Sequence, residues 1–72
     1  MRQKHVVIST LSEEVFEDVI SKLEDLKVNI IEERYNLLYH RYEIYAKLTL
    51  RQSYMLRHFL KSRDANIFEV GA

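Results

Sequence analysis

The residues best suited to metal chemistry are the three histidines, His5, His40 and His58. No two of them stand three or four residues apart, the spacing that would place two ligands on one face of a helix. The chain also has no cysteine, and a structural metal site needs about four converging ligands. The sequence therefore predicts surface positions for the histidines and no metal site.

Acidic residues are the other candidates for chemistry, either as Mg²⁺ ligands or as acid–base catalysts. They occur as the pairs Glu13–Glu14, Glu24–Asp25 and Glu32–Glu33, with Asp18 nearby. Mg²⁺ keeps most of its waters, and acid–base catalysis needs a polar cluster in a pocket. Solvated faces account for most of these acids, and no glycine-rich phosphate loop follows the first apolar run. We therefore expect no enzyme activity and no cofactor.

Composition narrows the class of partner. The chain has 72 residues, enough for one small domain over 1–72, and 47% of them are hydrophobic. Eleven basic and eleven acidic residues give a formal net charge of zero, which leaves little attraction for nucleic acid or anionic lipid. No run approaches the ~20 apolar residues that cross a bilayer. We expect no nucleic-acid partner, and contact with a membrane only through a parent chain.

Two helices are indicated by capping signals and apolar periodicity. The first is predicted over 11–27, with Thr10 or Ser12 as its N-cap and apolar residues at spacings of three and four. The second begins at Thr49, because Gln52 stands three residues later, as in a capping box.

Strands are indicated at both ends of the chain, while the middle fits two structures. The runs 5–10 and 65–70 have the composition of strands. In the middle, a helix is favoured by a heptad-like seam of Ile31, Tyr35, Leu38, Tyr42 and Tyr45. A strand is favoured by the alternation of apolar and mostly polar residues from Tyr42 to Leu50.

The terminal strands decide between these structures. An isolated pair of strands is marginal in water, and a hairpin over 28–50, with a loop around NLLYH, supplies the missing partners. The order β-α-β-β-α-β predicts an α+β, ferredoxin-like fold: a four-stranded antiparallel sheet with two helices on one face. The alternative is an all-α three-helix fold.

In this order, the chain resembles ACT-like regulatory domains, and more closely the C-terminal cytoplasmic domain of the MgtC/SapB family of bacterial inner-membrane proteins. The stretches that carry the resemblance are LEDLKVNIIEERYN, YEIYAKLTL and ANIFEV. The resemblance covers nearly the whole chain as a pattern of element lengths and apolar positions. It implies a cytoplasmic domain of an inner-membrane protein, with a regulatory or assembly role linked to magnesium transport or adaptation.

One turn departs from the ACT pattern. Amino-acid-binding ACT domains usually carry an Asp-x-Pro-Gly-like turn between the first strand and the first helix. This chain has STLSEE there, with neither glycine nor proline. The resemblance therefore implies an ACT-like domain without an amino-acid site.

The face of the sheet away from the helices is the expected site of function. Tyr45 and Lys47 alternate with core positions and should lie there, and Val7 and Ile67 should extend an apolar strip across it. We expect association with a protein, either a second copy in a homodimer or a membrane-embedded partner. The alternatives are a small helical interaction module and, more weakly, an RNA-binding ferredoxin-like module, although the glycine–aromatic motif of such modules is missing.

Overall fold

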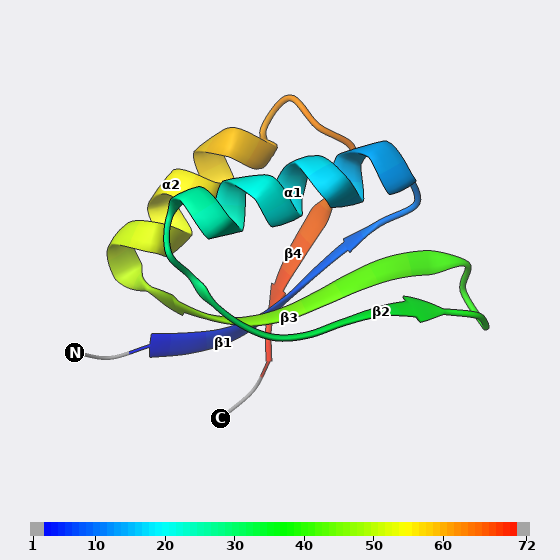
Figure 1. The fold of residues 1–72 in the computed structure, drawn as a ribbon, viewed down its shortest axis with the longest axis horizontal. Helices are drawn as coiled ribbons and strands as arrows, with labels where there is room; N and C mark the ends of the chain where they lie inside the picture. Colours follow the sequence, from blue (N-terminus) through cyan, green and yellow to red (C-terminus); the bar gives the residue numbers. More distant parts are fainter. Residues whose placement is uncertain (1–2, 71–72) are drawn as a thin grey trace.

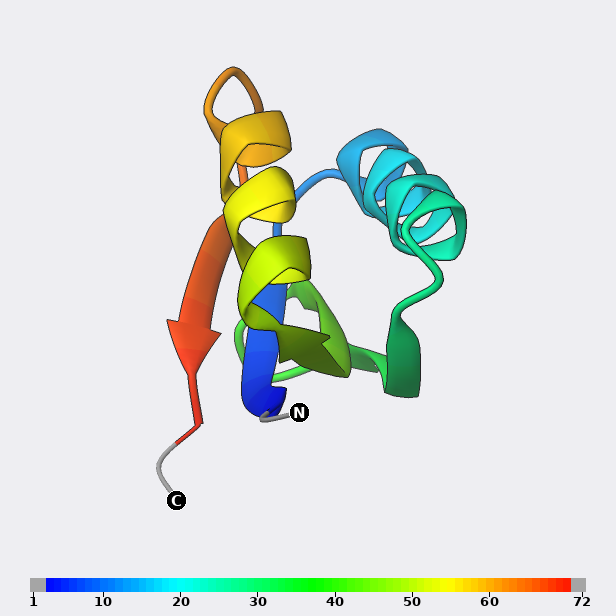
Figure 2. The same cartoon turned by 90° about the vertical axis from the view of Figure 1, so that its left-hand side faces the viewer.

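The structure is a computed structural model that describes residues 3–70. Its elements are, in chain order, β1 (Gln3–Thr10), α1 (Glu13–Asp25), β2 (Asn29–Asn36), β3 (Arg41–Thr49), α2 (Leu50–Leu60) and β4 (Asn66–Glu69). The strands form one antiparallel sheet in the order β2-β3-β1-β4, and both helices lie on the same side of it (Figure 1; Figure 2). The ferredoxin-like prediction is confirmed, and the all-α alternative is wrong.

The core lies between the helices and the two central strands. Alternate residues of β1 and β3 are buried on the helix side, namely Val6, Ile8, Ile44, Ala46 and Leu48. The helices cover them with the buried side chains of Val19, Leu23, Leu56 and Leu60. Full burial of such a side chain contributes roughly 1.5–3 kcal/mol, so this single layer supplies most of the stability of the fold.

The apolar alternation of β3 stops one position short of its predicted end. Leu50 is the first residue of α2 and is 75% exposed. At the other end of the strand, Tyr42 is half-buried, with its ring centroid 5.1 Å from that of Phe16 and 4.8 Å from that of Tyr35. Tyr42 therefore covers the end of the core below α1.

The hairpin between β2 and β3 turns through a loop that the side chain of Asn36 organises. Asn36 Oδ1 accepts hydrogen bonds from the backbone N–H groups of Leu38 (3.0 Å) and Tyr39 (3.2 Å). This local bonding is the usual reason for asparagine in turns. The left-handed position falls on His40, with φ of 54°.

The start of each helix is capped as its sequence indicates. Ser12 is the N-cap of α1, because its hydroxyl accepts from the N–H of Val15. Thr10 instead accepts from the N–H of Ser12 and donates to the carbonyl of Asp64, which ties β1 to the loop before β4. The predicted capping box at the start of α2 is confirmed.

The end of α1 is a Schellman motif, which stops the helix two residues before its predicted end. The N–H of Lys27 donates to the carbonyl of Glu24, and the N–H of Val28 donates to that of Leu23. Lys27 has a φ of 57°, in the left-handed region where a Cβ atom is unfavourable.

We predict that Lys27→Gly stabilises the protein. Glycine removes the steric cost of the left-handed conformation but adds backbone entropy to the unfolded chain, for a net gain of about 1 kcal/mol. The measurement is the free energy of unfolding in urea. Lys27→Ala is the control, because it removes the same charge and keeps Cβ; an equal gain from alanine would contradict the explanation.

Candidate interaction surface on the open face of the sheet

The side of the sheet without helices, called here the open face, carries a short apolar strip across three strands. Val7 on β1 lies opposite Tyr45 on β3 and opposite Phe68 on β4, and residues that face each other across a ladder share one side of the sheet. Val7 and Tyr45 are half-buried, and Phe68 is 57% exposed. We call Val7, Tyr45 and Phe68 the open-face strip.

The prediction that Ile67 belongs to this strip is wrong. Ile67 lies opposite the fully buried Ile8 and packs against the core on the helix side. Because side chains alternate between the faces of a strand, a shift of one residue moves a side chain to the other face. Phe68 therefore takes the place that was expected for Ile67.

The other predicted residues lie where they were expected. Val7 and Tyr45 are direct neighbours in the strip. Lys47 lies one step further along the same side of β3, opposite His5 on β1, and is half-buried. Lys47 thus borders the strip with a positive charge.

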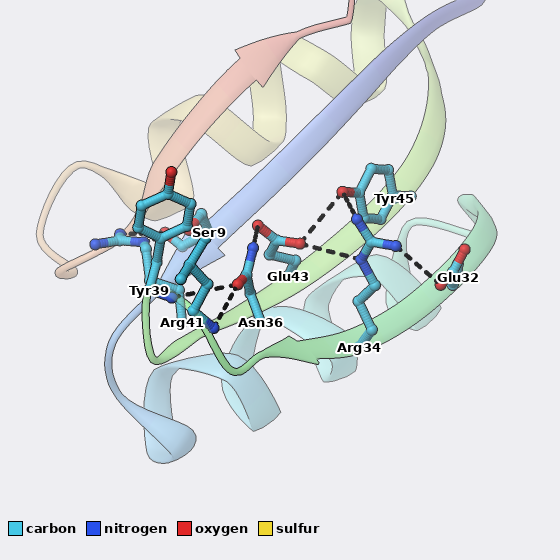
Figure 3. Close-up of polar contacts among 9 residues, drawn as sticks. Ser9, Glu32, Arg34, Asn36, Tyr39, Arg41, Glu43 and Tyr45 are labelled. Atoms are coloured by element: carbon cyan, nitrogen blue, oxygen red, sulfur yellow. Dashed lines mark hydrogen bonds and ion pairs between the residues drawn. The ribbon is translucent and has the colours of Figure 1, made fainter.

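A polar network beside the strip joins β2 to β3 (Figure 3). The guanidinium of Arg34 donates to Glu43 Oε1 (3.2 Å) and to the hydroxyl of Tyr45 (2.7 Å), and it lies 3.7 Å from Glu32. The Tyr45 hydroxyl donates in turn to Glu43 Oε1 (3.2 Å), and Asn36 donates to Glu43 Oε2 (3.4 Å). The side chains of the network hold one another in place.

A bulge in β2 brings this network onto the open face. Asn29 and Ile30 pair with Lys47 and Ala46 of β3, but the register then shifts, so that Glu32 lies opposite Tyr45. An extra residue in one strand reverses which face its later side chains occupy. The bulge therefore turns the alternate residues Glu32, Arg34 and Asn36 toward the open face.

The ionisation of Glu43 reflects these contacts. Burial alone would raise the pKa of Glu43, whose side chain is 14% exposed, but hydrogen bonds from Arg34, Asn36 and Tyr45 outweigh it and lower the pKa below its ordinary value. The same hydrogen bond to Glu43, with the nearby Tyr45, raises the pKa of Arg34. Both groups are charged at neutral pH.

A second arginine, Arg41 on β3, bonds to β1 on the open face. The guanidinium of Arg41 donates from Nε to the hydroxyl of Ser9 and from Nη2 to its carbonyl (3.3 Å). Ser9 is only 4% exposed as a result, although no helix within residues 3–70 covers this side. Both arginines of β2 and β3 are therefore bonded within the protein.

The hydrogen bonds around Glu43 limit the chemistry that its carboxylate could perform. The carboxylate of Glu43 accepts from three donors, which leaves it poorly placed to take a proton from a substrate. Within residues 3–70, no three His, Asp or Glu side chains converge as metal ligands. The three histidines lie in different parts of the fold: His5 is on β1, His40 is in the hairpin turn, and His58 is on α2.

Comparison with known proteins supports the fold alone. No protein-family model and no curated protein matches the chain. Among solved structures, it is similar to the uncharacterized protein TM1266 from Thermotoga maritima, with 12% sequence identity, a TM-score of 0.60 and coverage of 96% of each chain. In the part of the chain that the structure describes, no helix is long and apolar enough to cross a membrane.

We predict that Glu43 makes the stability of the protein depend on pH in the acid range. Its pKa is lower in the folded than in the unfolded state, where it is about 4.3. The unfolded state therefore binds the proton first, and the stabilisation, complete above the unfolded pKa, is lost as the pH falls through the folded pKa. Urea unfolding of the wild type and of Glu43→Gln over this pH range measures the difference between them.

Glu33→Gln is the matched control. Glu33 lies opposite Ile44, on the helix side of β2, and has no hydrogen bond or salt bridge within residues 3–70. We expect a difference from wild type that changes with pH for Glu43→Gln and a smaller change for Glu33→Gln. Equal profiles for the two variants would show that the network does not stabilise the fold.

Proposed function

We propose that the chain is a non-enzymatic regulatory or assembly domain that binds a protein partner through the open face of its sheet. The observation that carries this proposal is the open-face strip, an apolar and aromatic surface bordered by Lys47 and by the ion pair of Arg34 with Glu43. Exposed apolar surface with a polar rim is characteristic of protein interaction sites.

The strip is suited to binding because Tyr45, at its β3 end, is held in place before any partner arrives. The hydroxyl of Tyr45 bonds to Arg34 and Glu43, and the guanidinium carbon of Arg34 lies 4.8 Å from the Tyr45 ring centroid. Ordering loose side chains opposes association, so a fixed aromatic ring loses less entropy on binding. Aromatic residues are also the commonest anchors in interfaces.

The charges of the open face favour a protein over RNA. Phosphate binding draws on cations that can exchange their counterions for the backbone. Here Arg34 is neutralised by Glu32 and Glu43, and Arg41 bonds to Ser9. Titration with single-stranded RNA should give no saturable binding; a saturable, salt-sensitive isotherm would move the assignment to an RNA-binding module.

The MgtC/SapB resemblance adds a proposed setting for this domain. In that setting, it lies on the cytoplasmic side of an inner-membrane protein involved in magnesium transport or adaptation, and the open face contacts a membrane-embedded partner. Association rather than metal binding is then its mechanism. A Mg²⁺ titration followed by NMR should give weak and scattered shifts, and one saturable cluster of shifts would contradict a role without bound metal.

We predict that a photo-crosslinking amino acid at position 68 forms an adduct with a partner protein in the source cells. Tyr45→Ala in the same chain should reduce the yield at least about tenfold, because truncation of an aromatic anchor typically weakens binding by this much. The yield is measured by immunoblotting after irradiation, and circular dichroism confirms that each variant is folded.

The control is Tyr54→Ala, which removes a tyrosine that is 74% exposed on α2, on the helix side of the molecule. It should leave the yield at position 68 unchanged. No adduct at position 68, or equal losses from the two tyrosine variants, would exclude the open face as the binding surface.

A further inference from the structure

The two helices carry opposite charges. Within α1 there are six acidic residues and one lysine, whereas α2 has two arginines, one histidine and no acid. Lys61 and Arg63 follow α2 directly. The helix layer is therefore acidic on one side and basic on the other, although the whole chain has no net charge.

These charges lie on the outer surface of the helix layer. Figure 2 shows α1 and α2 as two adjacent ridges above the sheet. On α1, the positions opposite the buried Val19 and Leu23 are exposed and mostly acidic: Glu14, Glu17, Ser21 and Asp25. On α2 and its C-cap Lys61, the positions opposite the buried Leu56 and Leu60 are exposed and carry no acid: Arg51, Tyr54, His58 and Lys61.

The two helices do not neutralise each other. Four salt bridges occur within residues 3–70; two involve Arg34, and the others join Glu69 to Lys4 and to Arg57. None joins α1 to α2. The charges on the outer surface of the two helices thus have no ionic partner in the described part of the chain.

An apolar hollow lies between the charged ridges. It has a volume of about 300 Å³ and is lined by Lys22, Tyr54, Met55, His58 and Phe59. Tyr54 is 74% exposed and Met55 is 37% exposed. The outer surface of the helix layer thus places exposed apolar groups among charged residues, and an apolar centre with a polar rim is typical of protein interfaces.

The two helices run in opposite directions. The end of α1 therefore lies beside the start of α2, and this determines which charges lie at the same height along the helices. Asp25, at the end of α1, lines one hollow together with Arg51, at the start of α2. Asp18, in the first half of α1, lines another together with Asp25 and with Arg63, just beyond α2. Acidic residues of α1 and basic residues at the two ends of α2 therefore line the same hollows.

We propose that a second copy of this chain docks on the helix layer around a two-fold axis that runs parallel to the helices. This axis places α1 of each copy over α2 of its partner. Because the rotation does not change positions along the axis, residues at the same height in one copy face each other across the interface. Asp25 then meets the partner's Arg51 and Glu17 meets the partner's Lys61, and each contact occurs twice because a two-fold interface repeats every pair. Tyr54 lies over the small Ser21 of the other copy.

Charge complementarity selects this axis over the other two-fold arrangement of the same surfaces. An axis perpendicular to the helices would place α1 on α1 and α2 on α2, and like charges opposite one another are unfavourable. The proposed axis makes all four cross-contacts between opposite charges.

The size of the layer predicts a weak, salt-sensitive dimer. Thirteen residues of α1 span about 20 Å, and two helices side by side are also about 20 Å wide. The resulting footprint of about 400 Å² is about half of the area that each partner contributes to a standard interface. Surface charges contribute to its specificity and are screened by salt.

Charge reversal tests the geometry directly. Glu17→Lys sets lysine against the partner's Lys61, and Lys61→Glu sets glutamate against the partner's Glu17, so each variant alone should raise the dimer Kd at least about tenfold. A mixture of the two variants restores opposite charges at both contacts of a heterodimer. Sedimentation velocity over a dilution series, at low and high salt, measures the Kd.

The proposal stands if the wild type dimerises, each single variant weakens the dimer, and the mixture recovers it. It is overturned by a wild type that stays monomeric throughout the series, or by variants that dimerise as the wild type does. Both substitutions are at exposed positions away from the core, and unchanged thermal melting excludes loss of folding.

Tyr45→Ala separates this dimer from the function proposed for the open face. That variant alters the opposite side of the sheet, so it should leave the dimer Kd unchanged while it reduces the crosslinking yield at position 68. Tyr54→Ala should do the reverse, with a dimer Kd raised about tenfold. A dimer that is lost in Tyr45→Ala and retained in Tyr54→Ala would show that the copies meet through the sheet, contrary to the proposal.

Discussion

The pairing of β1 with β3 is the interaction on which the rest of the structure depends. The two strands are in register from Gln3 opposite Thr49 to Thr10 opposite Tyr42. β2 pairs only with β3, β4 pairs only with β1, and both helices pack on the apolar side of this central pair. With 72 residues and no disulfide, the protein has a single core to stabilise it, and that core lies on the helix side of the two central strands.

The open face carries the proposed interface, and both of its arginines are bonded to other side chains of the protein. Arg34 is held by two carboxylates and a tyrosine hydroxyl, and Arg41 is held by Ser9. Such a network stabilises the hairpin and also fixes the ring of Tyr45. One set of hydrogen bonds thus serves both the fold and the proposed interface, because the residues that join β2 to β3 border the apolar strip.

The two outer surfaces of the molecule differ in the kind of contact for which they are suited. The open face offers fixed aromatic and apolar side chains, whereas the helix layer offers charges of both signs that lack partners in the described chain. A dimer through the helix layer would leave two open faces exposed on opposite sides. Such a dimer would carry one binding site for a partner on each of its two copies.

Local sequence patterns were sufficient to predict the helices and strands and to place part of the open face. The capping box at Thr49 and the alternation along β3 follow from bonding and periodicity within a few residues, so the sequence alone predicted α2 and placed Tyr45 and Lys47 correctly. The fold order followed because the terminal strands needed partners. The predicted helix 11–27 ran two residues past the end of α1. The Schellman turn at Lys27 ends the helix there, and no glycine in the sequence signals that turn.

Tertiary structure decided the features that depend on register between distant strands. Ile67 and Phe68 are adjacent apolar residues in a strand of four, and only the pairing of β4 with β1 determines which of them faces the core. The bulge after Ile30 likewise turns Arg34 toward Glu43, and no local signal in NIIEERYN marks it. A shift of one residue changes little in the local energy of a strand but exchanges its two faces, so only the packed sheet fixes it.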